Sequence, residues 1–340
     1  MKAIDLDDIY NAGLLATFQE HADEEGLKQG ILRAGSTGFI NEQGEFLGSS
    51  NSCPRLLLLR SLGIDKTSVE KMIEDDLMFG AGRSNEVEWV NTLKAGVKAK
   101  GFGIDVLREE EFPIAWSLDN GVKVTGRPDI ILKGKQSGKP LLGVELKQIV
   151  ALSSAVKVLI EPKFSHLLQA AHYSYILGKI PYELWYTNRS IWPIADISSE
   201  WLLKDFLAVI KPDSPFVEKV TKQGQDLIGK LKTYRKGYKL IWRKNDKGQD
   251  SLEYHGIGES LSQVTCITWD GIKKYFEFVS EMIKTNELGG FPQEVDSTGF
   301  DKKSFSSCKY CELHHICCGR KKAKTVEEFV CQVKGEIVDL

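Results

Sequence analysis

The sequence predicts an α/β or α+β fold, in which a small central sheet is surrounded by helices. Two observations predict it. Apolar residues make up 42% of the 340 residues, enough for a core. The hydrophobic pattern also changes along the chain from helical spacing to alternation and back, which is typical of a sheet covered by helices. We expect one domain over residues 1–340.

Helical spacing and start signals predict the elements of the N-terminal part. Residues 4–30 carry apolar side chains at helical spacing, and the Gly-, Ser- and Asn-rich residues 34–52 predict a loop. Ser52 or Cys53 before Pro54 is typical of a helix start, so a helix is expected to continue through residues 56–62. Another helix is expected over residues 66–98, with a break near Gly80 and Gly82.

Alternation and turn chemistry then predict strands, and helices return between and after them. Strands are expected over residues 104–115, 121–133, 140–149 and 182–188, and as a pair within 238–256 around Asn245-Asp246-Lys247-Gly248. Helices are expected over residues 163–178, 200–232 and 269–287, the last ended by Gly289-Gly290.

The strands around residues 121–133 and 140–149 gather three charged side chains. If they form a hairpin that turns near Ser137, Asp129 lies eight residues before the turn and Glu145 eight after it. Residues directly opposite each other have Cβ atoms about 4.5–5.5 Å apart. Lys147 lies two residues after Glu145 and therefore projects from the same face. The hairpin is expected to place two carboxylates and an ammonium at one point.

Carboxylate oxygens are the ligands that Mg²⁺ prefers, and a metal with a nearby lysine suits phosphodiester hydrolysis. The alternative is a salt-bridged hairpin on a solvated face, because surface ion pairs are common. Three further features favour the metal site. Glu86, on the expected helix before the hairpin, offers a third carboxylate, and Gln169 and Tyr173 share a face of the helix after it. The third feature is the cysteines.

The spacing of the cysteines indicates metal or cluster binding. Cys308, Cys311 and Cys317 form a C-x2-C-x5-C pattern with Cys318 adjacent, and thiolates so close together are typical of metal centres. Cys53 is the best candidate for a fourth ligand, because a helix N-terminus favours the thiolate. Such a centre would close a loop of about 255 residues and stabilise the fold.

Zinc is the alternative for this centre. It would use Cys308 and Cys311 with two of the four residues His314, His315, Cys317 and Cys318, because zinc accepts mixed Cys and His ligands. Buried thiols that bind nothing are a second alternative. Cys266 and Cys331 are not expected to be ligands.

The order of these motifs resembles the RecB-like PD-(D/E)XK nucleases. Glu86, then Gly-Arg-Pro-Asp129, Glu145-Leu-Lys147 and Gln169-x3-Tyr173 follow the family's order. An early cysteine in Cys-Pro-Arg with a late C-x2-C-x5-C looks like its iron–sulfur branch, which includes the AddB nuclease and the RecB-like nuclease of CRISPR adaptation. Many members carry His where this chain has Glu86.

The resemblance implies a restriction-endonuclease-like mixed sheet flanked by helices, with a [4Fe–4S] cluster on Cys53, Cys308, Cys311 and Cys317 joining the N- and C-terminal segments. It implies Mg²⁺ or Mn²⁺ on Asp129 and Glu145, with the Leu146 carbonyl and Glu86 as further ligands. Lys147 would be the catalytic lysine, and Gln169 and Tyr173 would shape the site and contact nucleic acid.

The resemblance also implies an activity and an organisation. The expected activity is cleavage of single-stranded DNA from an end, with a recombination, replication or CRISPR-adaptation protein as a possible partner. Within the single domain we expect four parts: an N-terminal helical part (1–60), the nuclease core (61–200), an insertion (201–290) and a cluster-binding part (291–340). The alternatives are a non-catalytic nucleic-acid-binding module on the same fold, and a zinc-stabilised hydrolase.

The net charge, the apolar runs and the basic residues bear on the binding partners and the location of the protein. The formal net charge of −2 does not exclude nucleic-acid binding, because a local basic groove suffices. No apolar run reaches the roughly 20 residues that span a bilayer, and the first residues lack a secretory pattern, so we expect a cytoplasmic protein. The insertion contains basic residues interleaved with aromatic ones, which suits single-strand binding, although a solvated basic face is the alternative. They are Lys230, Lys232, Arg235, Lys236, Lys239 and Arg243, with Tyr234, Tyr238 and Trp242.

Overall fold

The structure is a computed structural model that describes residues 31–48, 52–54, 56–57, 69–149, 158, 161–188, 235–257 and 261–285. The chain divides into two compact units. One comprises residues 1–89, 115–125 and 273–340, and the other residues 90–114 and 126–272. The expected helices over residues 4–30 and 200–232 lie outside the described residues. In the part of the chain that is described, no helix has the length and apolar character needed to cross a membrane.

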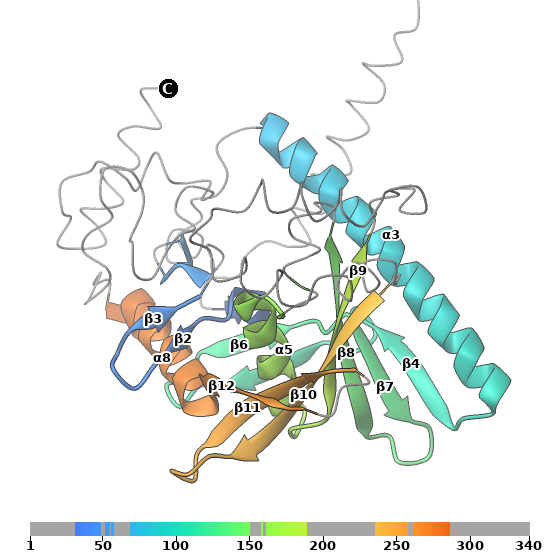
Figure 1. The fold of residues 1–340 in the computed structure, drawn as a ribbon. Helices are drawn as coiled ribbons and strands as arrows, with labels where there is room; N and C mark the ends of the chain where they lie inside the picture. The colour runs from blue at the N-terminus through green and yellow to red at the C-terminus, as the bar shows by residue number, and fades with distance from the viewer. Residues whose placement is uncertain are drawn as a thin grey trace, which may run out of the picture. The chain divides into compact units, whose positions relative to one another are not determined.

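A seven-stranded mixed sheet forms the framework of the second unit, in the order β12-β11-β10-β9-β8-β7-β4 (Figure 1). Its strands are β4 (Ile104–Arg108), β7 (Ile130–Gly134), β8 (Pro140–Ile149), β9 (Tyr182–Asn188), β10 (Arg235–Lys244), β11 (Asp250–Gly256) and β12 (Gln263–Thr268). The expectation of a mixed sheet with helices around it is confirmed, although the sheet is large rather than small.

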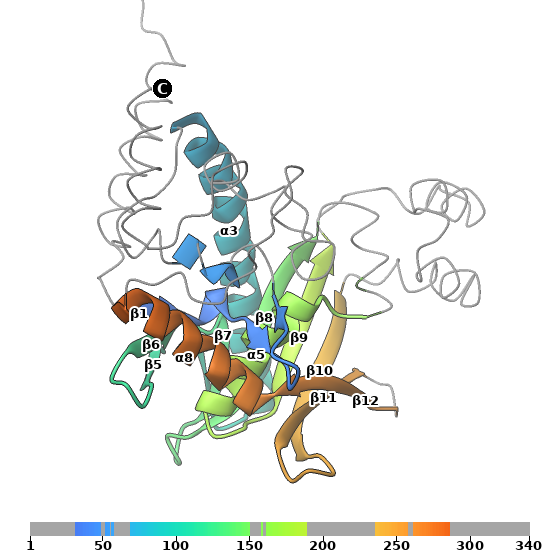
Figure 2. The same cartoon turned by 90° about the vertical axis from the view of Figure 1, so that its left-hand side faces the viewer.

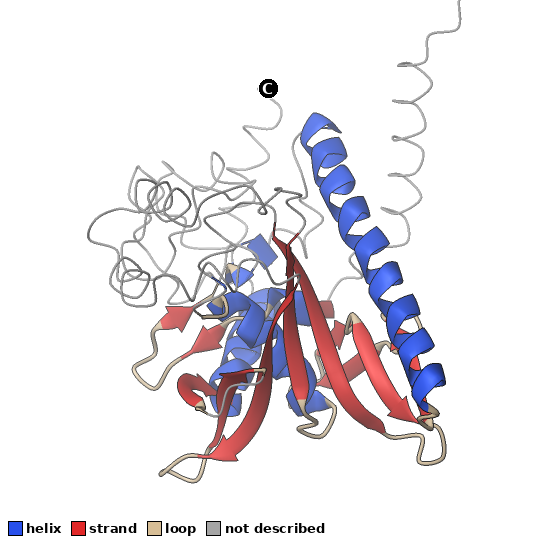
Figure 3. Cartoon of the chain, turned by 45° about the vertical axis from the view of Figure 1, so that its right-hand side comes forward, coloured by secondary structure: helices blue, strands red, loops and turns tan. Residues whose placement is uncertain are grey.

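Only β8 and β9 pair in parallel, whereas every other neighbouring pair in this sheet is antiparallel. Parallel neighbours need a crossover connection, usually a helix, and here α5 (Phe164–Ile176) lies between them in the sequence. α5 packs against β8, β9 and β10 (Figure 2). The strands twist across the sheet, as Figure 3 shows for β7, β8 and β9.

Side chains of the central strands form the core of this unit. Residues two apart in a strand share a face, and Tyr182, Leu184 and Tyr186 of β9 are all buried on the same face. Tyr238 and Leu240 of β10 continue this buried face. Tyr186 accepts the amide hydrogen bond of Lys163, directly before α5, at 3.0 Å. This is therefore the face of the sheet that α5 covers.

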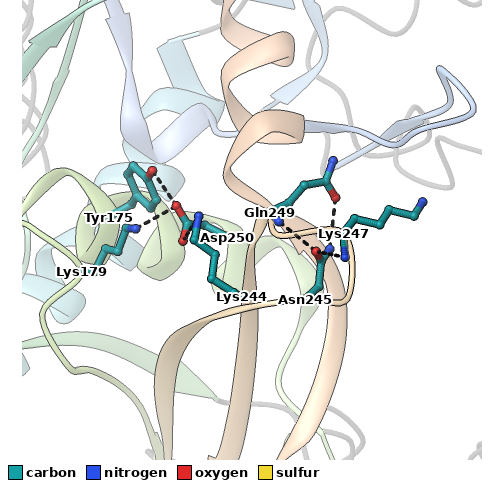
Figure 4. A network of polar contacts seen from close by, with 7 residues as sticks. All are labelled: Tyr175, Lys179, Lys244, Asn245, Lys247, Gln249 and Asp250. Atoms are coloured by element: carbon teal, nitrogen blue, oxygen red, sulfur yellow. Dashed lines mark hydrogen bonds and ion pairs between the residues drawn. The ribbon is translucent and has the colours of Figure 1, made fainter.

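An ionic network holds the far end of α5 to the β10–β11 hairpin (Figure 4). Asp250 accepts hydrogen bonds from Tyr175 at 3.0 Å and Lys179 at 2.8 Å, and it lies 3.2 Å from Lys244. Burial opposes the charge of Asp250, but these hydrogen bonds outweigh it and lower the carboxyl pKa. The expected turn at Asn245 is confirmed, since Gly248 has φ +75° and donates its amide to Asn245.

The first unit contains two small sheets. One has the order β1-β6-β5, from β1 (Ile31–Arg33), β6 (Lys123–Gly126) and β5 (Ile114–Ser117). The other pairs β2 (Phe39–Ile40) with β3 (Phe46–Leu47). A short 3-10 helix, η1 (Ala34–Ser36), lies between β1 and β2. The expectation of a loop over residues 34–52 was therefore too simple, because Phe39 and Phe46 are buried and pair these short strands.

Two helices contribute residues to both units: α3 (Val69–Lys100) and α8 (Trp269–Thr285). The expected break of α3 near Gly80 and Gly82 was wrong, since the helix is continuous. α8 is amphipathic as expected, and its apolar side chains Tyr275, Phe276 and Val279 are buried. Tyr275 donates to the carbonyls of Ser36 at 3.0 Å and Ser52 at 2.8 Å.

Proline positions explain where two expected strands divide. The strand expected over residues 104–115 is β4 followed by β5, and Pro113 lies between them. The strand expected over residues 121–133 is β6 followed by β7, with Pro128 between them. Proline has no amide hydrogen to give to a ladder, so it ends strand pairing. Asp129 therefore lies directly before β7 rather than within a strand.

Candidate functional site

The β7–β8 hairpin has the register that the sequence predicts. Ile130 pairs with Val144, Ile131 with Gly143 and Leu132 with Leu142. This register, continued by one residue, places Asp129 opposite Glu145. The turn closes through the Gly138 amide, which donates to the Gly134 carbonyl at 2.8 Å, and Gly138 has φ +64°. Glycine adopts that backbone conformation without the steric cost that other residues have.

The side chain of Asp129 is hydrogen-bonded to the backbone of β8. Its Oδ2 accepts the backbone hydrogen bond of Leu146 at 2.6 Å. The N–H and C=O of a residue in an antiparallel ladder point to the same side of the strand. The Leu146 carbonyl therefore faces the same side of β8 as the Asp129 carboxylate. The backbone of Leu146 thus orients one acid and offers a second oxygen beside it.

Glu145 and Lys147 form a charged pair on the covered face of β8. Lys147 Nζ donates to Glu145 Oε1 at 2.6 Å. The Glu145 side chain has no exposed surface, whereas that of Lys147 is 23% exposed. The expected position of Lys147 beside the two acids is thus observed. A solvated surface ion pair does not describe this arrangement, because a buried carboxylate loses its hydration and needs compensating charge.

The electrostatics of Asp129 indicate that this site favours a cation. Burial is the largest influence and raises the pKa of the Asp129 carboxyl well above its ordinary value, and the neighbouring Glu145 raises it further. Lys147 and the Leu146 amide act in the opposite direction and do not offset these influences. A cation between two such carboxylates relieves both the burial cost and the repulsion.

The available oxygen ligands fit a hard divalent cation. Asp129, Glu145 and the Leu146 carbonyl supply oxygens only, which Mg²⁺ and Mn²⁺ prefer over softer donors. Among the described residues, no group of three or more His, Cys, Asp or Glu side chains is placed to hold a metal ion. The possible ligand set is therefore two carboxylates and one backbone carbonyl.

Gln169 and Tyr173 lie on α5, where the sequence predicts them. Tyr173 is buried, and its hydroxyl donates a hydrogen bond at 3.2 Å to the carbonyl of Arg127. Arg127 lies two residues before Asp129 in the sequence. Burial, followed by the nearby Glu145, raises the pKa of Tyr173, while a hydrogen bond with Gln169 acts against this shift. Tyr173 therefore braces the chain that carries Asp129, and it stays protonated.

Tyr182 is a component of the site that the sequence analysis did not include. Its ring lies 6.2 Å from that of Tyr173, and its side chain is completely buried. Within the described residues its hydroxyl has no hydrogen-bond partner. Burial, Glu145 and Asp129 together raise its pKa, in that order of size. The aromatic pattern of β9 marked a strand, but nothing local indicated that Tyr182 faces the acids.

Glu86 and Cys53 belong to the other unit. Glu86 is half-buried in α3, and its role as a metal ligand stays a prediction. Cys53 is half-buried and its carbonyl accepts the Leu57 amide at 3.0 Å, so the predicted helix start is confirmed. Burial raises the pKa of the Tyr275 hydroxyl well above its ordinary value, and the nearby Cys53 raises it further.

The other predicted cluster ligands, Cys308, Cys311 and Cys317, lie outside the described residues, as do Cys318, His314 and His315. A cysteine at a helix N-terminus suits a thiolate ligand. Cys53 is therefore compatible with the cluster that the sequence predicts.

On β10, the basic side chains of Lys239 and Arg243 do not share a face with the aromatic side chains of Tyr238 and Trp242. Tyr238 and Trp242 lie four residues apart on one face of this strand, and both are buried. Tyr238 donates to the Val158 carbonyl. Lys239 and Arg243 point from the opposite face, so the two aromatic rings cannot stack on bases beside them. Lys230, Lys232 and Tyr234 lie outside the described residues, as do the side chains of Arg235 and Lys236.

In comparisons with family models, with curated proteins and with solved structures, nothing matches the chain.

Proposed function

We propose that this chain is a metal-dependent deoxyribonuclease of the PD-(D/E)XK type that hydrolyses single-stranded DNA from an end. The observation that carries the proposal is the β7–β8 hairpin. There, Asp129 accepts the Leu146 amide while Glu145 accepts Lys147, each at 2.6 Å. Two acids and one ammonium at the end of a hairpin are the groups that phosphodiester hydrolysis with a divalent cation requires.

Each residue has a definite role in this proposal. Asp129, Glu145 and the Leu146 carbonyl would hold Mg²⁺ or Mn²⁺, which polarises a phosphate and lowers the pKa of a bound water. Lys147 stands beside these oxygens with part of its side chain exposed, so its ammonium can orient the water that attacks the phosphate. Tyr173 holds the backbone of Arg127, and Gln169 would contact the strand.

The proposed [4Fe–4S] cluster on Cys53, Cys308, Cys311 and Cys317 has a structural role. It would connect residue 53 to the C-terminal segment and stabilise the fold without taking part in hydrolysis. Recombination, replication and CRISPR adaptation are the processes in which a partner protein would direct such an activity. Support for this part comes from the cysteine spacing and from the position of Cys53 at a helix start.

Cleavage of an end-labelled oligonucleotide tests the proposal. The full chain, purified without oxygen, should shorten a labelled single-stranded 30-mer with Mg²⁺ or Mn²⁺ and not without a divalent cation. Lys147→Ala should lower the rate by about 10²- to 10³-fold, as expected for loss of a charged donor that acts at the reacting atoms. Lys139→Ala is the matched control, because Lys139 is exposed in the turn of the same hairpin.

The thermal midpoint gives an independent measurement on the same variants. Mn²⁺ should raise the midpoint of the wild type and of Lys147→Ala, but not that of Asp129→Asn, which lacks one ligand charge. Undiminished cleavage by Lys147→Ala would remove the mechanism. Metal-independent DNA binding with no cleavage of any strand would favour a non-catalytic module.

A further inference from the structure

A histidine on the first turn of α5 lies beside the proposed site and has no role in it so far. His166 is half-buried, and its Nδ1 lies 3.0 Å from the hydroxyl of Tyr186. Tyr186 is 3% exposed and also accepts the Lys163 amide at 3.0 Å. The imidazole ring is thereby fixed to both β9 and the beginning of α5.

This network determines which nitrogen of His166 carries the proton. The Tyr186 hydroxyl accepts the Lys163 amide, so its own hydrogen needs a separate acceptor. Among the described residues, His166 Nδ1 is the acceptor within reach. A buried hydroxyl hydrogen without an acceptor is costly, so Tyr186 donates to Nδ1. The neutral imidazole then carries its proton on Nε2, which makes no hydrogen bond to a described residue.

His166 lies close to Lys147. Tyr186 and Lys147 are partners in the parallel register of β8 and β9, and their side chains project from the same face. Burial, then the charges of Lys147 and Lys163, lower the pKa of His166 to about 3. The imidazole is therefore neutral at physiological pH, and its N–H is a donor without charge beside a cationic side chain.

The two charges that act on His166, those of Lys147 and Lys163, are positive and attract an anion. The first turn of α5 contains no acidic residue, and Lys163 before it is exposed. A phosphate oxygen accepts hydrogen bonds from neutral donors and attracts lysine ammonium groups. In a nuclease, the anion that reaches Lys147 is the backbone of the nucleic acid.

We propose that His166, held by Tyr186, donates its Nε2 hydrogen to a backbone phosphate of the single strand next to the scissile bond. This inference rests on the proposed function and extends it to a substrate contact. His166 binds the strand and does not transfer a proton. Tyr186 is a positioning residue, because it acts on the strand only through the ring that it fixes.

Binding of a fluorescein-labelled single-stranded 30-mer, measured by anisotropy without divalent cations, tests the proposal. His166→Ala should weaken binding about tenfold, the effect of a hydrogen bond to a charged acceptor. His166→Gln should restore most of the affinity, since the glutamine amide places an N–H near the position of Nε2. Tyr186→Phe should weaken binding by about threefold, because the ring keeps its donor but loses its orientation.

The dependence on salt separates a neutral donor from a cation. Each phosphate neutralised on a single strand contributes about −0.7 to the slope of log affinity against log salt. His166→Ala should leave this slope unchanged, whereas Lys163→Ala, the control, should reduce it by about 0.7. In cleavage assays, His166→Ala should raise KM about tenfold and change kcat by less than about twofold.

Several outcomes overturn the inference. If the wild type cleaves DNA while His166→Ala and His166→Gln both bind as tightly as the wild type, His166 is a packing residue. If His166→Ala lowers the slope of log affinity against log salt, His166 binds the strand as a cation, which contradicts the proposal that it is a neutral donor. If the wild type neither cleaves nor binds DNA, the proposed function fails and this contact fails with it. Circular dichroism of each variant shows whether it is folded, and His166→Gln and Tyr186→Phe test the contact should His166→Ala unfold.

Discussion

Gly143 of β8 and the ring of Tyr182 on β9 are in closer contact than any side chain at position 143 would permit. They are register partners across the parallel pair. A Cβ atom at Gly143 would lie 2.1 Å from Cε2 of Tyr182 and 2.4 Å from its Cδ2. The ring therefore occupies the space where β8 lacks a side chain, two residues before Glu145.

Replacing Gly143 with alanine should destabilise the protein by about 1–3 kcal/mol, because the buried ring must move in a packed core. Chemical denaturation measures this change. Gly96→Ala is the control, since no atom lies within 4 Å of the added Cβ. It should stabilise the exposed C-terminal part of α3 by about 0.5–1 kcal/mol. Equal effects of the two substitutions would contradict the contact.

Tyr182→Phe should keep the ring and remove the buried hydroxyl that has no partner among the described residues. An unsatisfied buried polar group costs about 1–3 kcal/mol, so the variant should be more stable than the wild type by an amount in that range. The thermal midpoint and denaturant midpoint should both rise. A loss of stability would mean that the hydroxyl binds a water or a ligand within the site.

The stability of the folded protein should fall as the pH is lowered from about 6.5. Burial lowers the pKa of His172 to about 3 in the folded state, compared with about 6.5 in an unfolded chain. Between these values the unfolded state binds the extra proton, so stability rises with pH and is lost on acidification. The slope is about 1.4 kcal/mol per pH unit for one such group.

His172→Gln should remove one group that binds a proton in the unfolded state but not in the folded state. Denaturation at a series of pH values from about 4 to 7 should therefore show a smaller slope for the variant than for the wild type. His166 acts in the same direction as His172, whereas the raised pKa of the Asp129 carboxyl acts in the opposite direction, so the difference between variant and wild type is the quantity to measure. An unchanged slope in His172→Gln would show that His172 is not neutral in the folded protein.

Iron content tests the predicted cluster ligands. Anaerobically purified wild type should contain about four irons per chain, and Cys53→Ser should lose most of them. Cys266→Ser is the matched control, because Cys266 is exposed on β12 and is not expected to be a ligand. One zinc per chain, retained in Cys53→Ser, would instead support the zinc alternative.

The local sequence was sufficient to predict the register of the β7–β8 hairpin. The positions of Asp129 and Glu145 are symmetric about Ser137, and the register of Ile130 with Val144 agrees. This works because the partners are close in sequence and the turn sets their alignment. Pro128 also marked the beginning of β7, although we expected the strand to continue through it. β12 was missed, because it is a short edge strand with exposed Val264.

The amino-acid sequence by itself determined the α/β class, the hairpin with its two acids and lysine, and the cysteine pattern, since these depend on residues near one another in the chain. Only the tertiary structure decided that Tyr182 lies over Gly143, that Tyr186 fixes His166, and that Tyr238 and Trp242 are buried. Those contacts depend on strand order and on the face that α5 covers. Packing between distant segments sets both, and local pattern does not encode them.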